Sequence, residues 1–127
     1  MRFIPTRIHG AIDYLTGLAL IMAPFVLGFA DNGPAQWVPM ILGAAILVMS
    51  LMTDYELSLA RLIPMRAHLG VDAAGGLLLA ASPWLFGFAD QVFWPHLIIG
   101  MFEIAVALTT NTVPDTADVG VGRDYGR

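Results

Sequence analysis

Four apolar segments, each about 20 residues long, make up most of this chain. They cover residues 8–30, 35–53, 68–89 and 93–110, and short polar stretches separate them. A helix needs roughly 20 residues to cross the hydrocarbon core of a bilayer, and a lone strand would leave its backbone groups unpaired in lipid. The pattern therefore predicts four transmembrane helices, of which the second and fourth are short enough to stand nearly upright.

The chain contains an internal sequence repeat. Residues 9–31 recur at residues 68–90, and ten of the 23 positions are identical at a spacing of 59. A weaker repeat at a spacing of 57 relates residues 37–53 to residues 94–110. Because each unit holds an even number of spans, the second unit enters from the same side as the first. We predict an all-α membrane protein with four transmembrane helices, built as two tandem helical hairpins with pseudo-two-fold symmetry along the membrane normal.

Composition and charge favour the same fold. Hydrophobic residues make up 57% of the 127 positions and charged residues only 13%, whereas a soluble domain carries roughly 25% charged residues. All basic residues are arginines, and they fall before the first segment, between the second and third, and after the fourth. By the positive-inside rule, this places both termini and the middle connection in the cytoplasm, with the helices in a bacterial inner membrane. The arginines are Arg2, Arg7, Arg61, Arg66, Arg123 and Arg127.

These patterns divide the chain into four parts. Residues 1–53 form the first two-helix repeat and residues 68–112 the second. Residues 54–67 form a cytoplasmic amphipathic connection, in which a short surface helix ends at Pro64. Residues 113–127 are polar and rich in turn formers, so we expect a mobile cytoplasmic tail.

The first helix of each repeat carries a histidine and an aspartate four residues apart. These pairs are His9 with Asp13 and His68 with Asp72, and a spacing of four places each pair on one helix face. One hypothesis is a structural clamp that joins the two helices. The other is that the two-fold symmetry gathers both pairs into a proton relay or a site for a divalent transition metal. The spacing alone does not choose between them, and no cofactor motif is present.

Two further ionisable residues lie in the fourth segment. Glu103 falls about seven residues, or roughly 10 Å, from its inner end, where the first repeat has Ile46. An intramembrane glutamate is either functional or a neutral acid bonded to a neighbouring helix, and Glu103 joins the candidate polar or ion site. His96 has no partner in the first repeat, and we expect it at the outer interface.

The second repeat contains Ser82-Pro83-Trp84 within its first helix, where the first repeat reads Ala23-Pro24-Phe25. This tripeptide, placed inside a duplicated two-helix unit, resembles the SPW repeat of small bacterial integral membrane proteins. The resemblance implies a fold and a membrane location, and it brings no assigned reaction. Independently, Pro24 and Pro83 each free a carbonyl four residues earlier and should kink their helices, with Ser82 available to bond the freed carbonyl.

The functional expectation is a structural or interaction protein of the inner membrane that is not an enzyme. It would associate with itself or with another membrane protein. The alternative is a small proton-coupled or metal-linked carrier that uses the repeated His/Asp pairs and Glu103. Enzymatic activity is disfavoured because no nucleophile–base pair, phosphate loop or cofactor motif occurs. Nucleic-acid binding is disfavoured because the arginines are few and dispersed.

Overall fold

The computed structural model describes residues 1–114 as four α-helices. They are α1 (Thr6–Val26), α2 (Pro34–Met52), α3 (Met65–Leu85) and α4 (Trp94–Thr109), and the extended pairing within these residues is limited to isolated bridges. The all-helical prediction is therefore confirmed. The tail predicted at residues 113–127 lies, from residue 115 on, outside the described residues.

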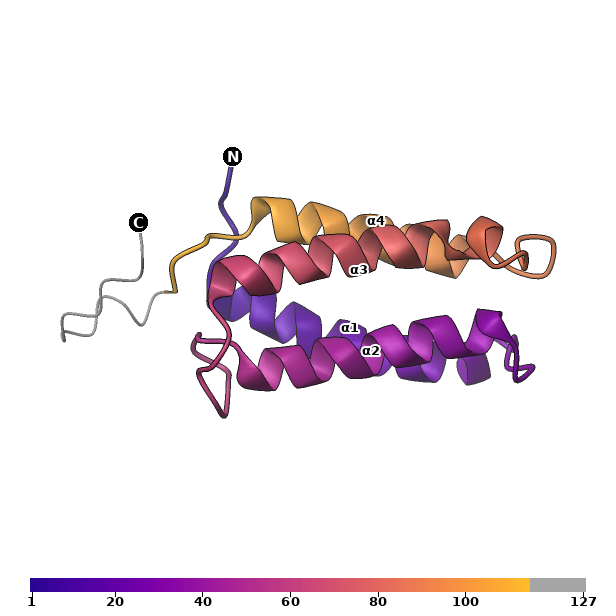
Figure 1. The fold of residues 1–127 in the computed structure, drawn as a ribbon, viewed down its shortest axis with the longest axis horizontal. Helices are drawn as coiled ribbons and strands as arrows, with labels where there is room; N and C mark the ends of the chain where they lie inside the picture. The colour runs from indigo at the N-terminus through magenta and orange to yellow at the C-terminus, as the bar shows by residue number, and fades with distance from the viewer. Residues whose placement is uncertain (115–127) are drawn as a thin grey trace.

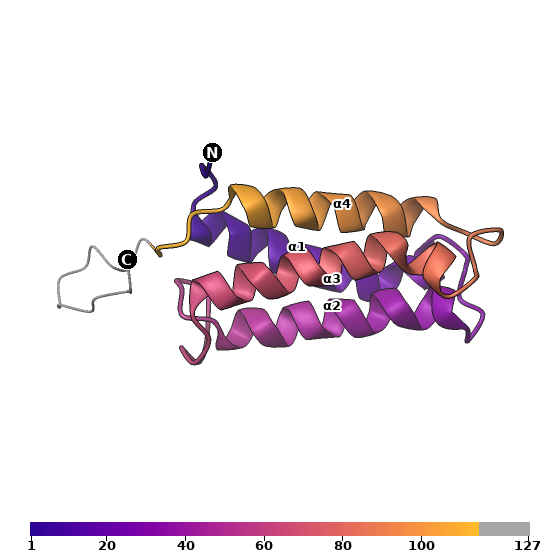
Figure 2. The same ribbon diagram turned by 45° about the horizontal axis from the view of Figure 1, so that its top comes forward.

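The helices form two hairpins that run along the long axis of the molecule (Figures 1 and 2). The α1–α2 and α3–α4 turns lie together at one end, and the N-terminus and the α2–α3 connection lie at the other. The side-chain amide of Gln91 donates to Asp31 Oδ2 at 2.8 Å and ties the two turns to each other. Two hydrogen bonds lower the pKa of the Asp31 carboxyl. The larger effect comes from the Gly33 backbone N–H and the smaller from the Gln91 amide. Both hairpins thus point the same way, as predicted from the even number of helices in each repeat.

The helix starts show that the repeat begins earlier than residue 9. Pro5 precedes α1 and Pro64 precedes α3, each in extended conformation. A proline is favoured at such a start because it lacks the N–H that the first turn leaves unpaired. The preceding isoleucine, Ile4 or Ile63, also repeats at the same spacing of 59. Pro64 therefore starts a helix instead of ending one.

The surface helix expected within residues 54–67 is not formed, and that prediction was wrong. Backbone N–H groups of this connection instead bond the last carbonyls of α2. Leu59 and Ala60 donate to the Leu51 carbonyl, and Leu62 and Ile63 donate to the Met52 carbonyl, at 2.9–3.0 Å. Such terminal carbonyls have no partner inside their own helix. Satisfying them holds the connection in an irregular path across the end of α2.

The predicted ends of the first and third helices were about four residues too late. Gly28 has φ +79° and Gly87 has φ +74°, a left-handed conformation that glycine adopts without steric cost. The chain then folds back, and the N–H groups of Phe29 and Phe88 donate to the carbonyls of Pro24 and Pro83, both at 2.8 Å. Glycine thus stops each helix one turn before the apolar pattern ends.

Glycine also sets the contact within each hairpin. A Cβ built on Gly43 would lie 2.6 Å from the Gly17 carbonyl oxygen, and one built on Gly100 would lie 2.5 Å from the Gly76 carbonyl oxygen. These two pairs occupy equivalent positions in the two repeats. The backbones of paired helices touch there, a close approach that small residues allow in membrane proteins.

Many polar side chains lie inside the bundle, together with some apolar ones, and many large apolar side chains lie outside. The buried set includes both His/Asp pairs, whereas Leu15, Ile41 and Leu77 are more than 60% exposed. An apolar exterior around a polar interior suits lipid as the solvent. Within residues 1–114, α1 and α2 are long and apolar enough to cross a membrane, and α4 is a shorter apolar helix.

Candidate metal centre

The two His/Asp pairs meet at one point between α1 and α3. His9, Asp13 and His68 are completely buried and Asp72 is 4% exposed. The aspartates lie one turn deeper than the histidines, so all four side chains reach the same level of the bundle. The sequence predicted these residues as a candidate site, and the structure brings them together.

Each histidine contacts both carboxylates. His9 Nε2 lies 3.1 Å from Asp13 Oδ2 and 3.0 Å from Asp72 Oδ2. His68 Nε2 lies 2.7 Å from Asp13 Oδ2 and 3.0 Å from Asp72 Oδ2, and the two Nε2 atoms are 3.4 Å apart. At most two Nε2–H protons serve these four contacts, because an imidazole nitrogen carries at most one hydrogen. Hydrogen bonds alone leave part of this set shared or unmet.

The other nitrogen of each histidine contacts a threonine from the opposite repeat. His9 Nδ1 is 2.9 Å from Thr110 Oγ1, and His68 Nδ1 is 2.6 Å from Thr53 Oγ1. Each threonine hydroxyl donates its hydrogen to the carbonyl four residues earlier, at 2.6–2.7 Å. The threonine oxygen must therefore accept from Nδ1–H, which leaves Nε2 to face the carboxylates. Metal-binding histidines are commonly oriented in this way through the nitrogen that does not bind the metal.

The threonines are held in place by the backbone at the ends of the hairpins. Ile4 pairs with Thr110 and Ile63 pairs with Thr53 in two short parallel bridges. In each bridge, the chain that enters the first helix of one repeat meets the chain that leaves the second helix of the other repeat. Neither threonine is among the site residues predicted from the sequence, although their repetition at a spacing of 57 is a signal that points to them.

The four converging atoms fit the ligand set of a divalent transition metal. All of them lie within 4.8 Å of one another. Ligand atoms placed tetrahedrally about 2.0 Å from one Zn²⁺ would be about 3.3 Å apart, close to the observed contacts. Imidazole nitrogen suits zinc, copper, iron and nickel, and two carboxylates would balance the charge of a divalent ion. The two carboxylates together offer about eight lone-pair positions. Outside the four-residue group, the Ser50 hydroxyl donates to one of them, on Asp13 Oδ2, at 3.2 Å.

Glu103 lies near the centre but outside the four-residue group. Its side chain is 1% exposed, and neither carboxyl oxygen has a hydrogen-bond partner within residues 1–114. Together with Asp72 and Ile46 it lines a small apolar cavity of about 40 Å³, which is room for roughly one water molecule. The structure therefore places Glu103 beside the His/Asp group rather than among its ligands.

The residues of the predicted kink lie in the last turn of each odd-numbered helix. Pro24 and Pro83 are buried, and each helix continues for only two residues beyond its proline. Ser82 Oγ donates to the Leu79 carbonyl at 2.7 Å, which is the carbonyl that Pro83 leaves free. Trp84 is 57% exposed, and its ring lies 5.8 Å from the ring of Phe93.

His96 lies in the first turn of α4, at the end of the bundle that carries the hairpin turns, and it faces the interior. It is 1% exposed, and its Nε2 donates to the Ala35 carbonyl at 2.9 Å. Its ring packs between Phe29 and Phe88, at centroid distances of 5.3 and 4.9 Å. The Ala35 carbonyl belongs to the first turn of α2 and faces α4. His96 is buried because its side chain donates to this carbonyl.

A duplicated helical hairpin with a polar interior and an apolar exterior defines the class of protein: an all-helical protein of membrane type. A family model described as the SPW repeat domain matches residues 7–110. The chain belongs to the SPW repeat family. No curated protein and no solved structure matches the chain. The family is membrane-associated and brings no function with it.

Proposed function

We propose that this chain is an integral protein of the bacterial inner membrane, with four spans and both termini in the cytoplasm. The exposed apolar side chains on all four helices support insertion. The end of the bundle that holds the N-terminus and the α2–α3 connection carries Arg2, Arg7, Arg61 and Arg66. The end with the two hairpin turns carries no basic residue. Cytoplasmic loops carry such an excess of arginine.

Cysteine labelling tests this topology, because the chain contains no cysteine of its own. Ala30→Cys places a thiol in the α1–α2 turn, and Leu59→Cys places one in the α2–α3 connection, where the native leucine is 86% exposed. A membrane-impermeant maleimide should label Ala30→Cys in spheroplasts and Leu59→Cys only after lysis. The reverse pattern, or labelling of both variants before lysis, would contradict the topology.

We further propose that the protein binds one divalent transition metal ion at the His/Asp centre. The observation that carries this proposal is the convergence of two imidazole Nε2 atoms and two carboxylate Oδ2 atoms in a buried site. Each Nε2 atom lies 2.7–3.1 Å from both Oδ2 atoms and 3.4 Å from the other Nε2 atom, and all four ligand atoms lie within 4.8 Å of one another. Two neutral imidazoles and two carboxylates around a divalent cation make a group with no net charge. Neutrality matters there because an uncompensated charge is costly in an apolar interior.

The role of the bound ion is to hold the two repeats together, and it involves no catalysed reaction. His9 and Asp13 come from the first repeat and His68 and Asp72 from the second, so one ion would crosslink α1 to α3. This joins the structural role expected from the sequence to the metal-linked alternative. A carrier is less well supported. Past Glu103, the bundle axis is filled by Leu20 and Leu79, each 1% exposed, and transport needs a polar route to both sides.

Metal binding is tested on the full chain in detergent after treatment with a chelator. Added Co²⁺ should bind at one equivalent per chain and give the visible absorption of a tetrahedral ion, and Zn²⁺ should displace it. His96→Gln is the matched control, since it removes a buried histidine outside the centre and should leave the stoichiometry unchanged. Failure of Co²⁺, Zn²⁺ and Mn²⁺ to bind above the level of a mock-purified sample would refute the proposal.

A further inference from the structure

A groove opens between the start of α3 and the end of α4, at the end of the bundle that carries the arginines. It has a volume of about 390 Å³. Its lining includes the apolar side chains of Leu69, Ala73 and Leu108, together with the polar side chains of Arg2, Arg66 and Thr112. No acidic side chain lines it among the residues that the structure describes. The groove thus combines an apolar floor with two positive charges.

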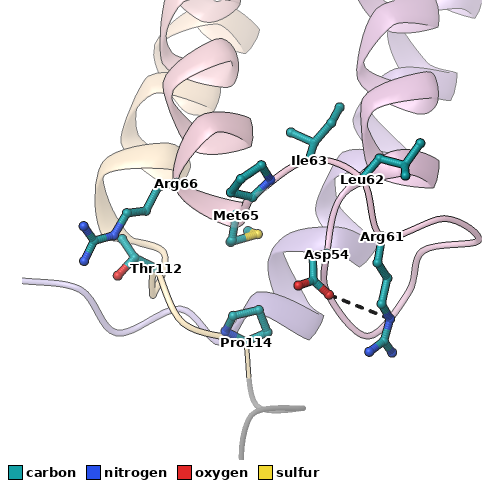
Figure 3. Close-up of a pocket in the computed structure, with 9 residues that line it drawn as sticks. Asp54, Arg61, Leu62, Ile63, Met65, Arg66, Thr112 and Pro114 are labelled. Carbon is teal, nitrogen blue, oxygen red and sulfur yellow. Dashed lines mark ion pairs between the residues drawn. The ribbon is translucent and has the colours of Figure 1, made fainter. Parts of the chain in front are cut away.

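The two arginines keep their charge available. Arg2 Nη1 donates to the carbonyls of Ala107 and Thr110, at 3.1 and 2.5 Å, so its guanidinium is held at the end of α4 by neutral acceptors. Arg66 is exposed and makes no ion pair within residues 1–114. Figure 3 shows the neighbouring pocket, which shares Arg66 and Thr112 with the groove; there Arg66 lies beside Thr112, apart from the pair formed by Asp54 and Arg61. By contrast, Arg61 Nε lies 3.8 Å from Asp54 Oδ1.

The first repeat fills the equivalent position. Tyr14 stands where the second repeat has Ala73, and its hydroxyl donates to the Leu57 carbonyl at 2.7 Å. Gly70, on the floor of the groove, has no atom within 4 Å of a Cβ built on it. The residue at the position of Arg66 in the first repeat is Arg7. The two repeats therefore share the arginine and differ in the space beneath it.

We infer that this groove binds one anionic phospholipid. The phosphate would lie between Arg2 and Arg66, and an acyl chain would follow the floor at Gly70 and Ala73 toward the bilayer core. Guanidinium groups pair well with phosphate oxygens, and basic pockets between helices on the cytoplasmic side of a membrane bind acidic lipid headgroups. The inference rests on the membrane insertion and topology proposed above, and it is independent of the metal centre.

Native mass spectrometry of the full chain tests the site. The protein in mild detergent is mixed with equal amounts of phosphatidylglycerol and phosphatidylcholine that have identical acyl chains. We expect one retained phosphatidylglycerol per chain, with a preference of about tenfold or more over phosphatidylcholine. Glycerol phosphate, which lacks acyl chains, should not displace it. Equal retention of both lipids, or displacement by glycerol phosphate at lipid concentrations, would overturn the inference.

Three variants separate charge from shape. Arg2→Gln with Arg66→Gln should abolish the preference, and Arg7→Gln is the control that should keep it. Ala73→Tyr leaves every charge in place and fills the groove as Tyr14 fills its counterpart, so it should also abolish retention. If Arg7→Gln lowered retention as much as the double variant, or if Ala73→Tyr bound lipid like the wild type, the site would be wrong. A failed topology would appear instead in the cysteine labelling, so the two proposals fail separately.

Discussion

Gly100→Ala should destabilise the second hairpin by roughly 3 kcal/mol, the upper part of the usual range for overpacking. A Cβ at this position would lie 2.5 Å from both the Gly76 carbonyl oxygen and the Ala80 backbone nitrogen. Neither contact is with a flexible side chain, so relief requires α3 and α4 to move apart. The movement would also lift α4, and Thr110 beyond it, away from His9. Unfolding in a denaturing detergent titration measures the loss.

Gly75→Ala is the matched control for this variant. Gly75 lies next to Gly76 in α3, yet a Cβ built on it has no atom within 4 Å. Alanine is favoured over glycine within a helix by up to about 1 kcal/mol. The control should therefore be as stable as the wild type or slightly more stable. If Gly100→Ala were equally well tolerated, the close backbone contact between the helices would not hold in the protein.

Much of the architecture follows from the duplication in the sequence. Two hairpins pointing the same way follow from an even number of helices in each repeat. The i,i+4 spacing puts each His/Asp pair on one helix face, and the repeat makes the two faces equivalent. What the sequence left open was whether the pairs face inward together or separately, which only the packing of the hairpins decides.

Other features depend on contacts that a hydropathy pattern does not contain. The apolar run continues past Gly28, but its positive φ ends α1, since backbone conformation and not hydropathy stops the helix. The amphipathic pattern at residues 54–67 favoured a helix. Backbone N–H groups of this segment instead donate to the carbonyls of Leu51 and Met52, so they are not available for helical hydrogen bonds. Thr53 and Thr110 reach the histidines because the segment after the second helix of each repeat pairs with the segment before the first helix of the other. These are tertiary effects that override local preference.

Asp13→Asn combined with Asp72→Asn should lower metal affinity by about a thousandfold or more, because it removes both charged ligands. In the wild type, a divalent metal at 1,000 times its Kd should raise the free energy of unfolding by about 4 kcal/mol. The double variant should show no such response. Thermal unfolding in detergent, with and without Zn²⁺, measures both effects. Asp31→Asn with Asp90→Asn is the matched control, since these aspartates repeat at the same spacing but are exposed.

The stability of the metal-free double variant, compared with that of the metal-free wild type, distinguishes a metal site from a structural clamp. Asn keeps a hydrogen-bonding oxygen beside each imidazole but removes two buried charges, which are costly to hold out of water. If the centre is maintained for metal binding at a cost in stability, the metal-free double variant should be as stable as the wild type or more stable. If the pairs serve as a clamp by themselves, the variant should lose several kcal/mol and neither protein should respond to metal. The second result would refute the metal centre and leave the structural role, because the same four side chains would then join α1 to α3 through hydrogen bonds alone.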